Sequence, residues 1–324
     1  MNNKVGLGTF PLAGVFNPIS SSEAEKLVKQ FIDLGGFYID TAPLYGNGEI
    51  EKLLGNTLKD VPRNKYYFCT KTVKHVDKQG KLFKSGKYKD VFEQIDNSLT
   101  RLKMDYVDLL MVHQTDDNVP IDETLKALED LQKTGKVKEL AVSNVNLDEL
   151  KEYNQTGKIK YVQNRFSLIN RSLSSDFKKY LIENQIYLMP YHLLEIGLLT
   201  GIAFEDFKLR EGDLRKNLPY WDSKNQEVIF KWVRDELSPI SKKLGITTGQ
   251  LNQAWALHQP FVDFIVVGTT KVEYLEINLK SNLIKLDKES LDEIEEAYKK
   301  LEKQILTDFH QTVREFRGLN EKFY

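Results

Sequence analysis

The sequence contains almost no cysteine and has no long apolar run. Its single cysteine, Cys69, excludes an internal disulfide framework and cysteine-based zinc sites, and it fits a reducing compartment. No uninterrupted apolar stretch is long enough to span a bilayer, and residues 1–4 lack the charged and apolar regions of a secretion signal. We therefore expect a cytoplasmic protein that does not associate with membranes.

An excess of charge of one sign is also missing. The chain carries 46 basic and 47 acidic side chains and a net charge of -1, so no global field draws it to nucleic acid or to an anionic membrane. Its five histidines show neither His-x-His nor His-Glu-x-x-His spacing, and no P-loop or Gly-x-Ser-x-Gly elbow is present. These absences favour a small-molecule partner and a site without metal.

Short apolar runs alternate with longer amphipathic segments, which is typical of βα units around a parallel sheet. Several runs, such as Val107–Val112, are apolar almost throughout, as expected for strands that are covered on both faces. The clearest amphipathic segment, Tyr88–Leu102, has apolar residues at three- and four-residue spacing. Eight strands are predicted, at Lys4–Thr9, Phe37–Thr41, Tyr66–Lys71, Val107–His113, Val137–Ser143, Tyr161–Gln163, Ile186–Tyr191 and Phe264–Val267.

The predicted fold class is α/β, a (β/α)8 TIM barrel, and the predicted domain is residues 1–324. A doubly wound dinucleotide fold would carry Gly-x-Gly-x-x-Gly after its first strand, but residues 6–11 lack the third glycine and contain a proline. Two segments interrupt the regular alternation of strands and helices. They are the long connection from His192 to about Tyr220, after the seventh strand, and the extra helical segment Gln250–His258. Residues 287–324 are expected to form a C-terminal helix and tail that pack on the barrel.

Four side chains of coherent chemistry follow consecutive predicted strands: Asp40, Tyr45, Lys71 and His113. In parallel barrels the carboxyl ends of the strands carry the active site. An ammonium beside a phenol favours the phenolate, so Lys71 should lower the pKa of Tyr45 while Asp40 holds Lys71 and His113 orients a substrate oxygen. Taken singly, each residue also has an ordinary structural interpretation, as packing, solvation or a turn cap.

The segments Asp40–Glu49, Tyr66–Lys71 and Asp105–His113 resemble the signature, lysine and histidine strands of the aldo-keto reductase superfamily, and the resemblance extends over essentially the whole chain. It implies an NAD(P)-dependent oxidoreductase that interconverts a carbonyl and an alcohol. In that reading Tyr45 is the general acid and base, and Asp40, Lys71 and His113 complete the catalytic set.

The resemblance also implies a nicotinamide dinucleotide site. NADP(H) is the expected cofactor and NAD(H) is the alternative, because Tyr274 and Ile277 replace the arginine and acidic residue frequent in the family. The residues Ser143, Asn144 and Gln163 have strand termination as their other interpretation. Implied cofactor contacts are Gly8, Thr9, Asp40, Ser143, Asn144, Gln163, Tyr191, Leu193, Gly197, Gly268, Thr269, Thr270, Lys271 and Asn278.

The expected substrate is a small carbonyl compound or a sugar, in a pocket lined by Phe10, Tyr45, His113 and Trp221. Asp-Thr-Ala-Pro-Leu-Tyr-Gly is similar to the branch that oxidises aldoses to lactones, so an aldose 1-dehydrogenase is one alternative. Residues 212–215 resemble the branch of general bacterial reductases instead. A nicotinamide-binding regulatory subunit without turnover is an alternative of another class. The oligomeric state is left open.

The connection after the third predicted strand is rich in lysine. If it borders the barrel mouth, it could attract phosphate groups or an acidic substrate. The other interpretation is a solvated, mobile loop, because runs of lysine usually only solvate a surface. The residues concerned are Lys74, Lys78, Lys81, Lys84, Lys87 and Lys89.

Overall fold

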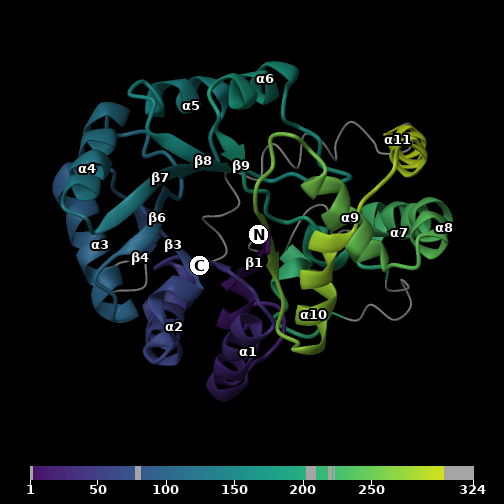
Figure 1. Cartoon of the computed structure of the whole chain (residues 1–324), viewed down its shortest axis with the longest axis horizontal. Helices are drawn as coiled ribbons and strands as arrows, with labels where there is room; N and C mark the ends of the chain where they lie inside the picture. Colours follow the sequence, from purple (N-terminus) through teal and green to yellow (C-terminus); the bar gives the residue numbers. More distant parts are fainter. Residues whose placement is uncertain (1–2, 77–81, 202–208, 218–220, 222, 303–324) are drawn as a thin grey trace.

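The computed structural model describes residues 3–76, 82–201, 209–217, 221 and 223–302. Eight parallel strands lie in one sheet in the order β10-β1-β2-β3-β6-β7-β8-β9, and helices cover its outer side (Figure 1). The strands are β1 Val5–Gly8, β2 Tyr38–Asp40, β3 Tyr67–Thr72, β6 Val107–Val112, β7 Val137–Ser143, β8 Ile159–Gln163, β9 Tyr187–Leu188 and β10 Ile265–Gly268.

The first and last strands of this order meet and close the barrel. The amide of Leu188 donates to the Phe261 carbonyl at 2.7 Å, and the amide of Val266 donates to the Pro190 carbonyl at 3.1 Å. A parallel bridge joins Leu188 and Val262. The predicted barrel is thus confirmed, and each of the eight predicted runs overlaps a strand of the sheet.

Several of the described helices begin at a residue whose side chain caps the first turn. Ser20 accepts a hydrogen bond from the amide of Glu23, whose side chain accepts one from the amide of Ser20, so a capping box starts the first helix. The predicted segment Tyr88–Leu102 is one helix with those bounds. The helices are α1 Ser21–Asp33, α2 Glu49–Leu58, α3 Tyr88–Leu102, α4 Ile121–Lys133, α5 Leu147–Tyr153, α6 Ser175–Glu183, α7 Ser223–Trp232, α8 Ser238–Lys243, α9 Thr248–Leu257, α10 Glu273–Lys280 and α11 Lys288–Glu302.

The barrel interior is filled by side chains, and a larger apolar core lies between strands and helices. The interior cluster contains Tyr38, Cys69, Leu109, Met111, Ala141, Tyr161, Met189, Phe264 and Val266. Because successive strand residues face opposite sides, this cluster occupies the inner face and leaves the carboxyl ends of the strands for polar side chains.

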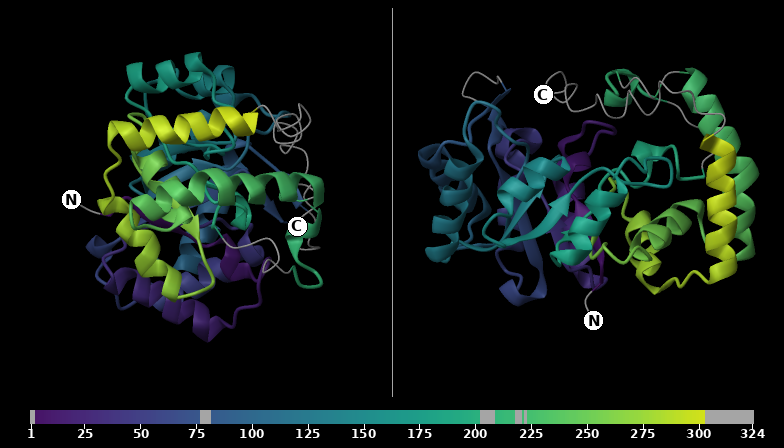
Figure 2. Two further views of the ribbon diagram at one scale, coloured as in Figure 1. Left: turned by 90° about the vertical axis from the view of Figure 1, so that its right-hand side faces the viewer. Right: turned by 90° about the horizontal axis from the view of Figure 1, so that it is seen from above.

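The C-terminal helix α11 packs beside α7 and α8 (Figure 2). The indole of Trp232 donates to the Ala297 carbonyl at 2.7 Å, and Arg171 pairs with Glu295 at 2.6 Å. The predicted tail, including Ile305, falls largely in residues 303–324, outside the described ranges. None of the helices within those ranges is long and apolar enough to cross a membrane.

Candidate active site

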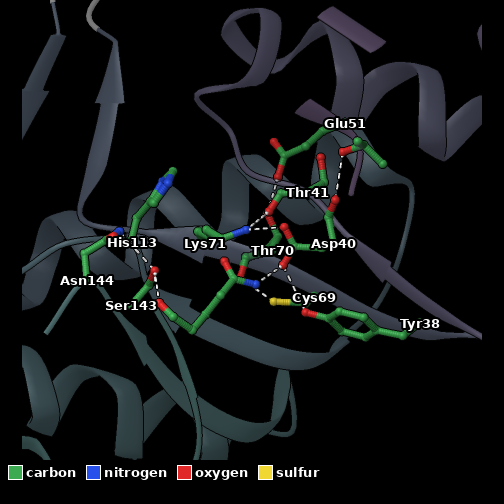
Figure 3. Close-up of polar contacts among 12 residues, drawn as sticks. Tyr38, Asp40, Thr41, Glu51, Cys69, Thr70, Lys71, His113, Ser143 and Asn144 are labelled. Atoms are coloured by element: carbon green, nitrogen blue, oxygen red, sulfur yellow. Dashed lines mark hydrogen bonds and ion pairs between the residues drawn. The ribbon is translucent and has the colours of Figure 1, made fainter. Parts of the chain in front are cut away.

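Asp40 is the centre of a buried polar network at the carboxyl end of β2. One carboxylate oxygen accepts a hydrogen bond from the Lys71 ammonium at 2.5 Å. The other accepts from the Tyr38 hydroxyl at 2.9 Å and from the Gln163 amide at 2.8 Å (Figure 3). Lys71 also donates to the Thr41 carbonyl at 3.0 Å. Both members of the charged pair therefore have several hydrogen-bond partners although they are almost completely buried.

Tyr45 and His113 lie next to this pair. The Lys71 ammonium is 5.4 Å from the centre of the Tyr45 ring, and the Tyr45 and His113 rings are 6.1 Å apart in an edge-to-face arrangement. Tyr45 comes from the short helical turn Tyr45–Gly48, and His113 directly follows β6. The structure thus brings together the four side chains that the sequence predicted to be catalytic.

The pKa of Tyr45 is raised well above its usual value, first by burial and then by the negative charge of Asp40. The sequence predicts a lowered pKa, and this net direction is wrong. The physical reason is that burial and the Asp40 carboxylate both favour the neutral phenol over the phenolate. The Tyr45 phenol is therefore held in its protonated form at neutral pH.

The pKa of His113 is lowered well below its usual value, first by burial and then by the charges of Lys71 and Lys74. Its Nδ1 atom is buried and has no hydrogen-bond partner among the residues that the structure describes. A neutral imidazole with an unused ring nitrogen is suited to hydrogen bonding with an uncharged substrate oxygen.

The residues expected at the nicotinamide form a connected set. The Tyr191 hydroxyl donates to Asn144 Oδ1 at 2.6 Å, and the Asn144 amide donates to the His113 carbonyl at 2.9 Å. Ser143 donates to the Gln163 carbonyl at 2.7 Å. The side chains end β7 and β8 or follow β9, so they lie at the same barrel mouth as Asp40 and can recognise a carboxamide and a flat ring.

Two residues predicted as cofactor contacts also have structural roles at this mouth. The Thr9 hydroxyl is fully buried and donates to the Asp40 carbonyl at 2.9 Å. A Cβ on Gly8 would lie 2.9 Å from Val266 Cγ1, so glycine allows β1 and β10 to pack closely. Leu193 is buried, and Gly197 has a positive φ of 114° in the loop after β9.

The segment expected at the adenosine end leads into α10. Thr269 accepts a hydrogen bond from the amide of Lys271 at 3.0 Å, and no side chain caps the first turn of α10. Gly268 and Lys271 are exposed and Thr270 is half-buried. Gln253 donates to Asn278 Oδ1 at 2.9 Å, while Gln253 Oε1 is buried without a partner in the described part of the chain. The uncapped start of α10 and the Lys271 ammonium fit a phosphate group. The unsatisfied amide oxygen of Gln253 fits an adenine group.

An aromatic wall extends outward from Tyr45. The Phe10 ring is 5.1 Å from Tyr45 and 5.7 Å from Phe16. The guanidinium of Arg215 lies 5.5 Å from the Phe16 ring and 5.3 Å from the Trp221 ring. Phe10 is therefore in contact with the candidate catalytic tyrosine, and Trp221 contacts Arg215, which also lies over the Phe16 ring.

The lysine-rich connection contains a hairpin of β4 Lys74–Val76 and β5 Leu82–Lys84, which the sequence did not predict. Lys74 is buried and donates to Gln114 Oε1 at 3.2 Å, and Lys84 donates to Asp117 at 2.9 Å. These two lysines are thus anchored to the segment after β6. Lys87 and Lys89 are exposed, and Lys78 and Lys81 lie outside the described residues.

Two contributors to the site were missed by the sequence analysis. Tyr38 donates to Asp40, and Phe16 continues the aromatic wall. Tyr38 could have been found, because it lies two residues before Asp40 and so on the same strand face. Phe16 carries no local signal, since its loop conformation depends on Arg210, which donates to the Phe16 carbonyl at 2.9 Å.

Within the described residues, no three His, Cys, Asp or Glu side chains are grouped so that they could hold a metal ion. The polar groups that the described residues bring to the site are the buried ion pair, the phenol and the imidazole. An organic cofactor would complete it.

Known proteins share this architecture and much of the sequence. The family model described as the aldo/keto reductase family matches residues 4–299. The chain is 30% identical over 281 residues to Aldo-keto reductase YhdN of Bacillus subtilis, covering 85% of this chain and 83% of that relative. It is 28% identical over 315 residues to the NADH-specific methylglyoxal reductase of Escherichia coli, covering 91% and 95% of the two chains.

A glycerol dehydrogenase from Gluconobacter oxydans is similar in structure, with a TM-score of 0.82 and 26% sequence identity. The superposition covers 92% of this chain and 91% of that one. The similarity therefore extends over the strands and loops that carry the candidate site.

Proposed function

Because this chain belongs to the aldo/keto reductase family, we propose that it reduces small aldehydes and ketones, with Tyr45 as the residue that transfers the proton. Membership of the family makes the chain an NAD(P)-dependent oxidoreductase. The observation that carries the residue assignment is the position of the Tyr45 ring beside the buried Asp40–Lys71 pair and the neutral His113.

Each side chain has a distinct role in this proposal. When bound, the reduced nicotinamide supplies the hydride that adds to the carbonyl carbon. His113 donates a hydrogen bond to the carbonyl oxygen and orients it, and Tyr45 gives that oxygen its proton. Lys71 then stabilises the phenolate, and Asp40 keeps Lys71 in place. In the oxidative direction the phenolate of Tyr45 takes the proton from the alcohol.

The chain's own residues would hold the dinucleotide at both ends. Ser143, Asn144 and Gln163 would bind the carboxamide, and Tyr191 would stack on the ring. For Gln163 this requires its amide to turn away from Asp40, which still keeps the hydrogen bond from Tyr38.

We propose NADP(H) as the preferred cofactor, with Lys271 contacting the 2′-phosphate. The Lys271 ammonium lies 5.6 Å from the centre of the Tyr274 ring, close to the start of α10, where a phosphate is favoured. The methylglyoxal reductase relative is NADH-specific, so the preference is a property to be measured. Lys271→Gln should raise the KM for NADPH and leave that for NADH unchanged; an equal effect on both would contradict the assignment.

The aromatic wall supports an apolar carbonyl substrate over a free sugar. Phe10 lies next to Tyr45, and Phe16 packs edge-to-face against Phe10, so this side of the site is apolar. The glycerol dehydrogenase relative nevertheless makes the oxidative direction worth testing. A panel should therefore compare methylglyoxal and aromatic aldehydes with NAD(P)H against glycerol and free pentoses with NAD(P)⁺.

Tyr45→Phe tests the central assignment. Loss of the general acid should lower kcat about 10²–10⁴-fold. Since the Tyr45 hydroxyl makes no hydrogen bond with the described residues, the melting temperature and the dinucleotide affinity should be retained. Tyr66→Phe is the matched control, because Tyr66 is also a buried phenol and directly precedes β3, at the opposite end of the strands from the mouth. Near-normal turnover of Tyr45→Phe would overturn the proposal.

The same measurements address the regulatory alternative. Tight dinucleotide binding by the wild-type protein, combined with no turnover on any carbonyl or alcohol of the panel, would favour a non-catalytic binding subunit.

A further inference from the structure

The loop after β9 has an unusual backbone. His192, Glu195 and Ile196 all have positive φ angles, of 55°, 44° and 56°, although none is a glycine. For a β-branched residue such as Ile196 this conformation is unfavourable, and it persists only where the surroundings enforce it. The contacts around residues 192–197 should therefore include groups that hold this shape.

A buried ion pair provides such contacts. Glu195 is fully buried, and one of its oxygens accepts two hydrogen bonds from the Arg165 guanidinium, that from Nε at 3.1 Å. Its other oxygen accepts a hydrogen bond from the Ser167 hydroxyl. On the far side, the Asn252 amide of α9 donates to the Leu193 carbonyl. The donors all come from outside the loop, on the segment after β8 and on α9.

Buried ion pairs add little net stability, because the cost of removing two charges from water offsets their attraction. Their best-attested use is to select one conformation among several. Here the carboxylate belongs to one of the strained residues, so its fixed partners act directly on the backbone at residues 195 and 196.

The loop adjoins the candidate site on two sides. Arg165 is bridged in parallel register to Tyr191, whose hydroxyl contacts Asn144. The Ile196 carbonyl accepts a hydrogen bond from Arg215 at 3.3 Å, and Arg215 also contacts the aromatic wall. A change in the backbone path of residues 192–197 would therefore displace the expected dinucleotide contacts.

We propose that Arg165 and Glu195 are positioning residues for the dinucleotide: they hold residues 192–197 in the left-handed shape that binds it, without touching the reacting atoms. This inference rests on the proposed function. The pair sets the fraction of molecules in which the loop is ready to bind, and so it sets the dinucleotide affinity. It leaves the chemical step itself unchanged.

The test replaces both charges together, in the variant Arg165→Met/Glu195→Leu, which fills the space and leaves no unpaired charge. The melting temperature should be retained or raised. If the ready fraction falls to about one tenth, the Kd for NADPH rises about tenfold, while kcat at saturating NADPH stays near the wild-type value. In the ligand-free protein, the amides of Glu195, Gly197 and Leu199, which are hydrogen-bonded within the loop, should exchange with deuterium faster.

A rescue variant separates positioning from general destabilisation. Adding Ile196→Gly to the double variant removes the penalty for the left-handed conformation, since glycine adopts it freely, and should restore most of the NADPH affinity. Ser167→Ala, which removes only one hydrogen bond to Glu195, should weaken NADPH binding in the same direction and by less. It keeps the test decisive if the double variant does not fold.

Glu51 supplies a matched control. It is also fully buried and accepts hydrogen bonds from an arginine, Arg101 at 2.7 Å, and a hydroxyl, Thr70 at 2.7 Å. Glu51→Leu/Arg101→Met should leave the Kd for NADPH unchanged. An unchanged Kd in the Arg165 and Ser167 variants, or an equal rise in the Glu51 control, would overturn the positioning role. Failure of the wild-type protein to bind either NADPH or NADH would instead overturn the proposed function, and this inference with it.

Discussion

The buried Asp40–Lys71 pair predicts an unequal response to the loss of each partner. Asp40→Asn leaves the Lys71 ammonium with only neutral oxygens, including the Thr41 carbonyl at 3.0 Å. Lys71→Met leaves the Asp40 carboxylate with two good donors, Tyr38 at 2.9 Å and Gln163 at 2.8 Å. The remaining carboxylate is thus better solvated by the protein than the remaining ammonium.

The expected losses of unfolding free energy follow from the hydrogen bonds that each remaining charge keeps. An unbalanced buried charge costs about 3–5 kcal/mol, which we expect for Asp40→Asn. For Lys71→Met the expected cost is at most the lower end of that range, about 3 kcal/mol, because the carboxylate keeps two hydrogen bonds that are each worth about 1.5–3 kcal/mol. The double variant removes both charges, so its cost should be smaller than the sum of the single costs by at least about 1 kcal/mol.

Equilibrium unfolding in urea measures these differences, with an unchanged m-value as the condition for comparing midpoints. Two results would refute the reasoning. One is a larger loss for Lys71→Met than for Asp40→Asn, and the other is strict additivity in the double variant. Tyr38→Phe in the Lys71→Met background is an internal check, because it removes one of the two donors and should enlarge the loss.

Three further outcomes are expected. Burial lowers the pKa of His192 from 6.5 to about 3. Between these two pH values the unfolded chain binds more protons than the folded protein does. The free energy of unfolding therefore falls as the pH drops below about 6.5, by about 2 kcal/mol at pH 5. His192→Asn, which tolerates the positive φ, should reduce the fall of the melting temperature between pH 7 and 5, part of which remains because the pKa of His113 is also lowered; an unchanged slope would contradict the cause. A Cβ on Gly6 would lie 2.2 Å from Tyr38 Cδ1, so Gly6→Ala should destabilise by about 1–3 kcal/mol in urea unfolding and lower kcat, and a neutral effect would contradict this packing. Arg210→Ala frees the Gly14 and Phe16 carbonyls and should raise the KM for aromatic aldehydes while leaving the Kd for NADPH unchanged; a shift in that Kd instead would argue against a substrate-side role.

Local pattern predicted the strands, the clearest helices and the four catalytic candidates. Strand period and strand ends are properties of neighbouring residues, and a parallel barrel brings all carboxyl ends to one mouth. Asp40, Lys71 and His113 could therefore be placed together before any contact was known. The direction of the Tyr45 pKa shift could not be predicted, because it depends on how deeply the phenol is buried and on how close the Asp40 carboxylate lies to it.

The sequence by itself determined the barrel and the chemical types at its mouth, since alternation and spacing are encoded within a few residues. Only the tertiary structure decided which distant groups meet: Glu195 with Arg165, Phe16 with Arg215, and the Gln163 amide with Asp40. These pairings join segments about 30 to 200 residues apart, and loops can follow many paths between fixed strand ends at similar cost. The packed barrel selects among those paths, and in doing so it sets the shape of the site.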